Sequence, residues 1–199
     1  MPGKEKKKKR RGRRYYLNDF HLVGSEYVYR GNMYAFDGGQ RERRRFLTLI
    51  TLGSFVSLLT AAGQEVFPPV EMSDSLFTTI PWLLQMIAVC TVIWGVYKLL
   101  RGNDPMREYV YEKSVKKLPV RLLISMAASF VTFASEAIYI VIKGFGRSAV
   151  NTVMRPSLAL VNGLLCLSLH LLVKKARWNL INQISADAEP NSGDPETKQ

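Results

Sequence analysis

Four stretches of the chain are long, apolar and nearly free of charged residues, whereas charged residues crowd the segments between them. The stretches are 46–62, 77–100, 120–142 and 153–173. An α-helix rises about 1.5 Å per residue, so about 20 apolar residues cross a hydrocarbon core of about 30 Å. A helix of a soluble bundle would carry polar residues along an outward face, and these stretches do not. The pattern predicts an all-α membrane protein, with a four-helix transmembrane bundle over residues 46–178.

Basic residues are distributed unevenly among the segments that flank these stretches. Fourteen Lys or Arg residues precede the first stretch, six lie between residues 101 and 121, and four follow residue 173, whereas the 64–76 segment has none and carries three acids. Cationic loops resist translocation and stay on the cytoplasmic side, which also explains the net charge of +12. We therefore expect a multi-pass protein of the cell membrane with both termini in the cytoplasm, as an even number of spans requires.

The segment before the first stretch begins with a basic block and continues with strand-forming residues. Residues 1–14, which include KEKKKKRRGRR, are expected to be a disordered basic tail and topology signal, with attachment to anionic headgroups or RNA as the alternative. Nucleic acid is disfavoured because no aromatic residues for base stacking are interleaved with the charges. Within 15–45, the alternating run Glu26–Phe36 has Gly31-Asn32 at its middle. This pattern predicts a small cytoplasmic β-hairpin, to which residues 15–22 offer a third strand.

The segment 104–117 has the pattern of a short amphipathic helix. Asp104 suits the N-cap, Pro105 suits the first helical position, and apolar residues recur at helical spacing. We expect this helix to lie on the anionic lipids of the inner leaflet, with docking of another protein as the alternative. After Trp178 the chain becomes polar, and residues 179–199 are expected to form a tail.

Small and hydroxyl residues recur on one face of three of the apolar stretches. Such residues let helices approach closely and hydrogen-bond to one another, so we expect these faces to pack on protein and not on lipid. The candidate helix-packing residues are Gly53, Ser57, Ser125, Ser129, Thr132 and Gly163. The pattern indicates a compact bundle, or a surface that packs on another membrane protein.

Glu136 is an acid within the third stretch, where a charge is costly and usually paired or functional. At the helical rise per residue, Glu136, Arg155 and Gln85 all lie roughly 5–12 Å outward from the middle of their spans. We therefore expect them to form an intramembrane polar cluster. A structural Glu136–Arg155 ion pair, with Gln85 helping to satisfy it, is the favoured interpretation. An outward-facing ion or substrate site is the alternative.

Residue types that carry catalysis or bind metals form no recognisable pattern in this chain. It has two histidines and two cysteines, without the spacing of a zinc site, and it lacks a glycine-rich phosphate loop and a nucleophile elbow. We therefore expect no cofactor and no enzyme activity. The hypothesis is a non-catalytic accessory or assembly subunit that packs on another membrane protein or on itself. The alternative is a small oligomeric transporter or channel protomer that uses Glu136.

Overall fold

The computed structural model describes residues 20–23, 26–29, 31–66, 75–102, 104–144 and 149–181. These residues are mostly helical, and four helices are long and apolar enough to cross a membrane. The helices are α1 Gln40–Gly63, α3 Leu76–Leu100, α5 Leu118–Lys143 and α6 Ala149–Lys175. Each contains one of the four apolar stretches, so the prediction of four helices of spanning length is confirmed. The predicted basic tail 1–14 and residues 182–199 lie outside the described residues.

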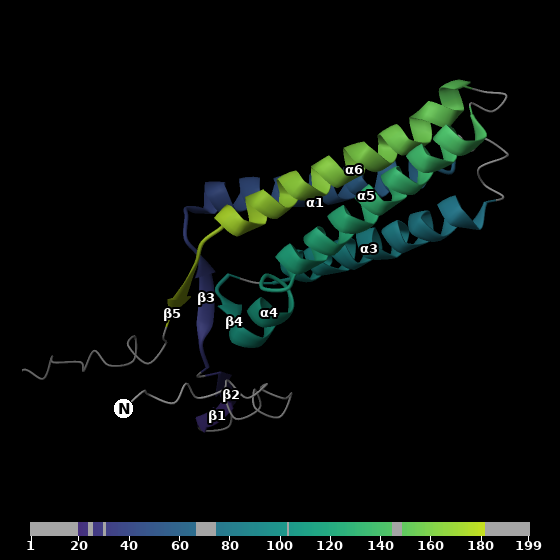
Figure 1. Cartoon of the computed structure of the whole chain (residues 1–199). Coiled ribbons are helices and arrows are strands. Elements are labelled where there is room, and N and C mark those ends of the chain that lie inside the picture. The colour runs from purple at the N-terminus through teal and green to yellow at the C-terminus, as the bar shows by residue number, and fades with distance from the viewer. Residues whose placement is uncertain are drawn as a thin grey trace, which may run out of the picture.

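The four helices lie side by side in an elongated bundle, and each packs mainly on two others (Figure 1). The order around the bundle is α1, α3, α5, α6 and back to α1, so α3 lies diagonally opposite α6. The chain connects α1 to α3 and α5 to α6 at one end, which we call the far end. A small sheet lies at the opposite end, which we call the sheet end.

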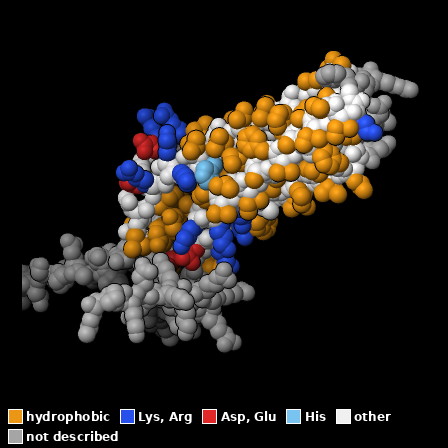
Figure 2. Space-filling view, viewed as in Figure 1, with side chains coloured by type: hydrophobic (Ala, Val, Ile, Leu, Met, Phe, Trp, Pro, Cys, Tyr) orange, Lys and Arg blue, Asp and Glu red, His pale blue; other side chains and the backbone are white. Residues whose placement is uncertain are grey.

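The bundle buries many polar side chains and exposes large apolar ones along its outer surface, unlike a water-soluble protein. Gln85 and Asn162 are completely buried, whereas the exposed fractions of Ile87, Leu52 and Val131 are 62%, 59% and 56%. Figure 2 shows apolar side chains over the visible face of the helices, with Lys and Arg gathered mainly at the sheet end. Lipid tails solvate apolar side chains and leave polar groups to be satisfied within the protein, so this arrangement suits a bilayer.

An antiparallel sheet of three short strands forms the sheet end. Its strands are β3 Met33–Phe36, β4 Met106–Arg107 and β5 Trp178–Ile181, in the order β4-β3-β5. β3 precedes α1, β4 lies between α3 and α5, and β5 follows α6. Strands from these three segments pair only where the segments emerge on the same side of the bundle. The chain therefore runs along the bundle an even number of times between one strand of the sheet and the next.

Aromatic side chains attach the sheet to the helices. The ring of Phe36 on β3 stacks on Phe46 of α1 with centroids 5.6 Å apart, and it meets the Trp178 ring of β5 edge-on at 5.3 Å. Tyr111 contacts Trp178 and stacks on Tyr34 at 4.0 Å. The apolar core beneath these rings includes Ile50, Val92, Leu99, Met106, Leu118 and Val173. The sheet is therefore packed on the bundle and continuous with its core.

An N-terminal hairpin is present, but its two strands are β1 Phe20–Val23 and β2 Glu26–Tyr29, and the pairing expected across Gly31-Asn32 is not formed. β2 pairs with β1, whereas β3 pairs with β4 and β5. The alternating pattern located the strands, but Gly31-Asn32 separates two sheets and does not fold β2 onto β3. The bundle brings distant segments to β3, and these replace the local partner. Residues 179–181, expected in the polar tail, accordingly lie in β5.

The predicted amphipathic helix 104–117 is shorter in the structure, where α4 spans only Glu108–Lys113. Asp104 does not cap this helix, and its carboxylate instead pairs with Arg43 of α1 at 3.3 Å. Met106 is buried in the core of the sheet end and belongs to β4. Pairing with β3 therefore takes the residues that the first turn of a longer helix would need.

Candidate functional site

The interior of the bundle changes from apolar near the sheet to polar toward the far end. Polar groups buried away from water are costly unless they are hydrogen-bonded or paired. The buried polar residues of the helices include Ser57, Gln85, Ser125, Ser129, Thr132, Ser135, Glu136, Thr152, Arg155 and Asn162. Two groups of contacts organise this interior, one around Arg155 and one around Asn162.

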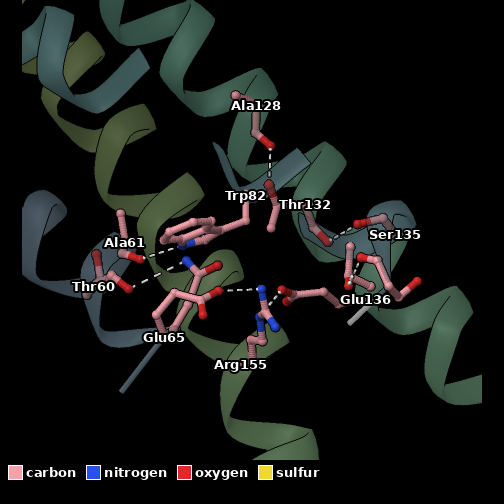
Figure 3. Close-up of polar contacts among 12 residues, drawn as sticks. Thr60, Ala61, Glu65, Trp82, Ala128, Thr132, Ser135, Glu136 and Arg155 are labelled. Carbon is pink, nitrogen blue, oxygen red and sulfur yellow. Dashed lines mark hydrogen bonds and ion pairs between the residues drawn. The ribbon is translucent and has the colours of Figure 1, made fainter. Parts of the chain in front are cut away.

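Arg155 of α6 lies between two acids, Glu136 of α5 and Glu65 just beyond α1 (Figure 3). Its Nε lies 2.8 Å from Glu136 Oε1, and its Nη2 donates a hydrogen bond of 2.7 Å to Glu65 Oε1. The Glu136 contact is a close ion pair without the alignment of a hydrogen bond. The Arg155 and Glu136 side chains are completely buried, whereas that of Glu65 is 33% exposed. We call these three residues the Arg155 cluster.

The position of α6 in the ring explains this geometry. Because α6 packs between α1 and α5, the long side chain of Arg155 points inward and reaches Glu136 on α5 and Glu65 just beyond α1. The planar guanidinium carries several donors in fixed directions, which suits it to bridging two carboxylates. The Arg155 cluster holds three helices together at the far end, with two acids against one base.

Gln85 is fully buried on α3, but it does not join the Arg155 cluster through a hydrogen bond. Neither its Oε1 nor its Nε2 has a hydrogen-bond partner among the described residues. α3 lies diagonally opposite α6, so Glu65, at the end of the adjacent α1, takes the place expected for Gln85. The structure thus pairs Glu136 with Arg155, as expected, and leaves Gln85 apart. Glu65 was missed because it falls outside the apolar stretches.

Asn162 connects three helices near the middle of the membrane-spanning region. The Ser57 hydroxyl of α1 donates to Asn162 Oδ1 at 2.6 Å, and Asn162 Nδ2 donates to Ser129 Oγ of α5 at 3.2 Å. One turn along α6, the Cys166 thiol contacts Ser125 Oγ at 3.4 Å. Two of the predicted packing residues, Ser57 and Ser129, therefore meet on Asn162, a residue that sequence reasoning missed, and a third, Ser125, contacts Cys166. The spacing of Asn162 from Cys166, one helical turn, was the available signal.

The remaining predicted packing residues also lie at helix contacts. A Cβ added to Gly53 of α1 would lie 2.6 Å from Leu169 Cδ2 of α6, too close for an unshifted side chain. A Cβ added to Gly163 would lie 3.4 Å from the Phe130 ring of α5. Thr132 is buried, and its hydroxyl bonds to the Ala128 carbonyl of its own helix at 3.0 Å. Small residues thus permit the close approach of α6 to both neighbours.

Replacing Asn162 by Leu should destabilise the bundle by about 1 kcal/mol, the usual size of an interhelical hydrogen-bond contribution in membranes. The substitution removes both side-chain bonds to α1 and α5. Unfolding of the detergent-solubilised protein by a denaturing detergent measures the change. Ser168→Ala is the matched control, because the Ser168 hydroxyl is exposed and bonds only within α6. Equal losses in both variants would contradict a bridging role for Asn162.

The chemistry available to these clusters is ion pairing and hydrogen bonding. Among the described residues, no group of three His, Cys, Asp or Glu side chains is arranged to hold a metal ion. Cys90 is exposed and Cys166 is buried, and both are free thiols. The Arg155 cluster can therefore fix the helices, or it can accept a cation through its second acid.

No protein-family model matches the chain, and neither a curated protein nor a solved structure is detectably similar to it.

Proposed function

We propose that this chain is a non-catalytic accessory or assembly subunit of a membrane complex, with its sheet end in the cytoplasm. The observation that carries the proposal is the Glu136–Arg155 ion pair, in which both side chains are completely buried. A charged residue inside a membrane usually marks either a transport path or a structural pair. Here an acid and a base from adjacent helices neutralise each other's charge, which supports the structural role.

The exposed edge of the sheet supports contact with a partner outside the membrane. β5 is an edge strand, and its Leu180 and Ile181 side chains are 50% and 44% exposed. Edge strands with exposed apolar side chains pair readily with another chain. The aromatic contacts of Trp178 hold this strand against the bundle. An exposed edge that is packed on the bundle suits docking of another subunit.

The distribution of charge supports the cytoplasmic placement of the sheet end. Lysines and arginines flank the helix ends there, including Lys98, Arg101, Lys117, Lys174 and Lys175. At the far end, the described charged residues near the surface include Glu65 and Lys143, whereas Arg155 is buried in its ion pairs. Basic residues next to spanning helices favour the cytoplasmic side.

Gentle detergent extraction of the full chain, followed by mass determination and identification of what co-purifies, tests the proposal. A different protein should co-purify in a fixed stoichiometric ratio. It should be lost from the variant with Leu180→Asn and Ile181→Asn, and retained by Val66→Asn, a control at an exposed position of the far end. Isolation of a lone monomer from the native membrane would contradict the proposal.

A second candidate function is a small oligomeric transporter or channel protomer that uses Glu136. The excess of acid in the Arg155 cluster and the buried, unpartnered amide of Gln85 favour it. Two acids beside one base leave a negative charge that a cation or proton could neutralise. Isolation of a homo-oligomer, together with loss of flux in Glu136→Gln while assembly is intact, would favour this function over the first.

A further inference from the structure

A hollow of about 920 Å³ lies at the sheet end, between the last turns of α3 and the β4–α4 segment. Its wall includes Trp94, Tyr97, Lys98, Arg101, Arg107 and Lys113. The first four belong to the end of α3 or directly follow it. Arg107 belongs to β4, and Lys113 is the last residue of α4. The hollow therefore spans the level at which α3 leaves the apolar part of the bundle.

The charge of this hollow is strongly positive. Four cations line it, and the acid among its lining residues is Asp104, whose carboxylate pairs with Arg43 at 3.3 Å. Lys98, Arg101 and Lys113 form no ion pair with an acid in the part of the chain that the structure describes. Cations held close together without acids repel one another, so the site favours an anion that lies between them.

Aromatic side chains hold three of these cations in place. The Lys98 ammonium lies 5.0 Å from the centroid of the Trp94 ring and the Arg101 guanidinium 5.3 Å from that of Tyr97, whereas the Lys113 ammonium donates a hydrogen bond of 2.5 Å to the Tyr109 hydroxyl. Attraction to a ring face restricts a flexible cationic side chain before any ligand arrives. Aromatic residues are also enriched at the level of lipid headgroups. The site is thus partly ordered in advance and sits at the membrane interface.

A row of exposed apolar side chains runs along the outer face of α3, from the hollow toward the middle of the helix. Leu83, Ile87, Cys90 and Trp94 fall within about 60° of one another around the α3 axis, because helical residues advance by about 100° each. All four side chains are exposed. A soluble anion would leave this row unused. The acyl chain of a lipid whose phosphate occupied the hollow would lie along it.

We infer that this hollow binds an anionic phospholipid, with the headgroup phosphate between Lys98, Arg101 and Lys113 and an acyl chain along α3. The inference goes beyond the proposed function, because the lipid site needs no partner subunit. It also narrows the expected contact with inner-leaflet lipids from the 104–117 segment as a whole to one site that α3 shares.

Native mass spectrometry of the full chain in a neutral detergent, titrated with phosphatidylglycerol or phosphatidylcholine, tests the inference. We expect one saturable site that prefers phosphatidylglycerol. The double variant Lys98→Gln, Arg101→Gln should weaken binding by about tenfold or more, since each cation near an anionic lipid surface contributes severalfold. Lys113→Gln, on the opposite wall, should also weaken binding. Each variant should keep its thermal stability in neutral detergent, because these side chains are not fully buried.

The matched control is Lys174→Gln, Lys175→Gln, which removes two exposed cations at the same end of the bundle but outside the hollow. It should change binding by less than about twofold, whereas general attraction to surface charge would weaken both double variants equally. The N-terminal basic block is present in every variant, so its contribution cancels. Equal weakening by the control, an absence of preference between the two lipids, or displacement of the lipid by millimolar inorganic phosphate would each overturn the inference.

Discussion

Replacing Glu136 by Gln is expected to destabilise the bundle by about 3 kcal/mol, at the low end for a broken buried ion pair. Arg155 would then remain completely buried with only the partly exposed Glu65 as its counter-charge. Arg155→Met should cost at least as much, because Glu136 would lose its ion-pair partner within the bundle. Unfolding free energies in mixed micelles, measured under one set of conditions, give both values.

The double variant Glu136→Gln, Arg155→Met should recover much of the stability that either single change loses. A buried pair replaced as a unit is often nearly neutral, because no uncompensated charge is left inside. Glu65→Gln is the matched control and should cost less than about 1 kcal/mol, since the Glu65 side chain is 33% exposed. Single-variant losses that simply add in the double variant would show that Glu136 and Arg155 are not coupled.

Replacing Val131 by Arg should destabilise the protein in a bilayer by about 2.5–3.5 kcal/mol, the insertion cost of a charge at the centre of a span. Val131 lies at the middle of α5 with its side chain 56% exposed, so the new charge would face lipid. If water surrounded the bundle, an exposed substitution of this kind would change stability by less than about 0.5 kcal/mol. The environment of the helices therefore determines the result.

Val120→Arg is the matched control for this prediction. Val120 is also exposed, but it lies in the first turn of α5 at the sheet end. An arginine there can extend along the helix and place its charge among the headgroups. It should cost much less than Val131→Arg, as measured by the folded fraction of each variant in liposomes. Equal, small effects at both positions would contradict a membrane-embedded bundle.

The helices could be predicted because their signal is local. An apolar stretch that crosses a bilayer must satisfy its backbone hydrogen bonds within itself, so length and hydropathy alone specify a helix. The contact between Glu136 and Arg155 could also be predicted, because both lie in the same half of their spans and long side chains bridge a difference in depth of a few ångströms. Depth does not say which helices are neighbours, however. Gln85, for example, lies on α3, which packs on α5 but not on α6, and its amide forms no hydrogen bond with the pair.

The sheet could not be predicted in full because its pairing is not local. The alternating pattern located strand-forming residues, but the partners of β3 are β4 and β5, far along the chain. Those two strands have few residues, and β5 lies in a segment that reads as a polar tail. Their pairing depends on the bundle, which brings the three segments to one end. Asn162 was missed for a related reason. The role of a single amide in an apolar stretch depends on its hydrogen-bond partners, and here these are Ser57 and Ser129 on two other helices.

If the four helices cross the membrane, they return β3, β4 and β5 to the same side of it. The most direct test is labelling with a membrane-impermeant maleimide in a background where Cys90 and Cys166 are replaced by serine. Val66→Cys reports on the far end, and Lys117→Cys and Asn179→Cys report on the sheet end; all three positions are exposed. In intact cells only Val66→Cys should be labelled, and the other two should react only after permeabilisation. Labelling of Val66→Cys and Asn179→Cys from the same side would contradict the account.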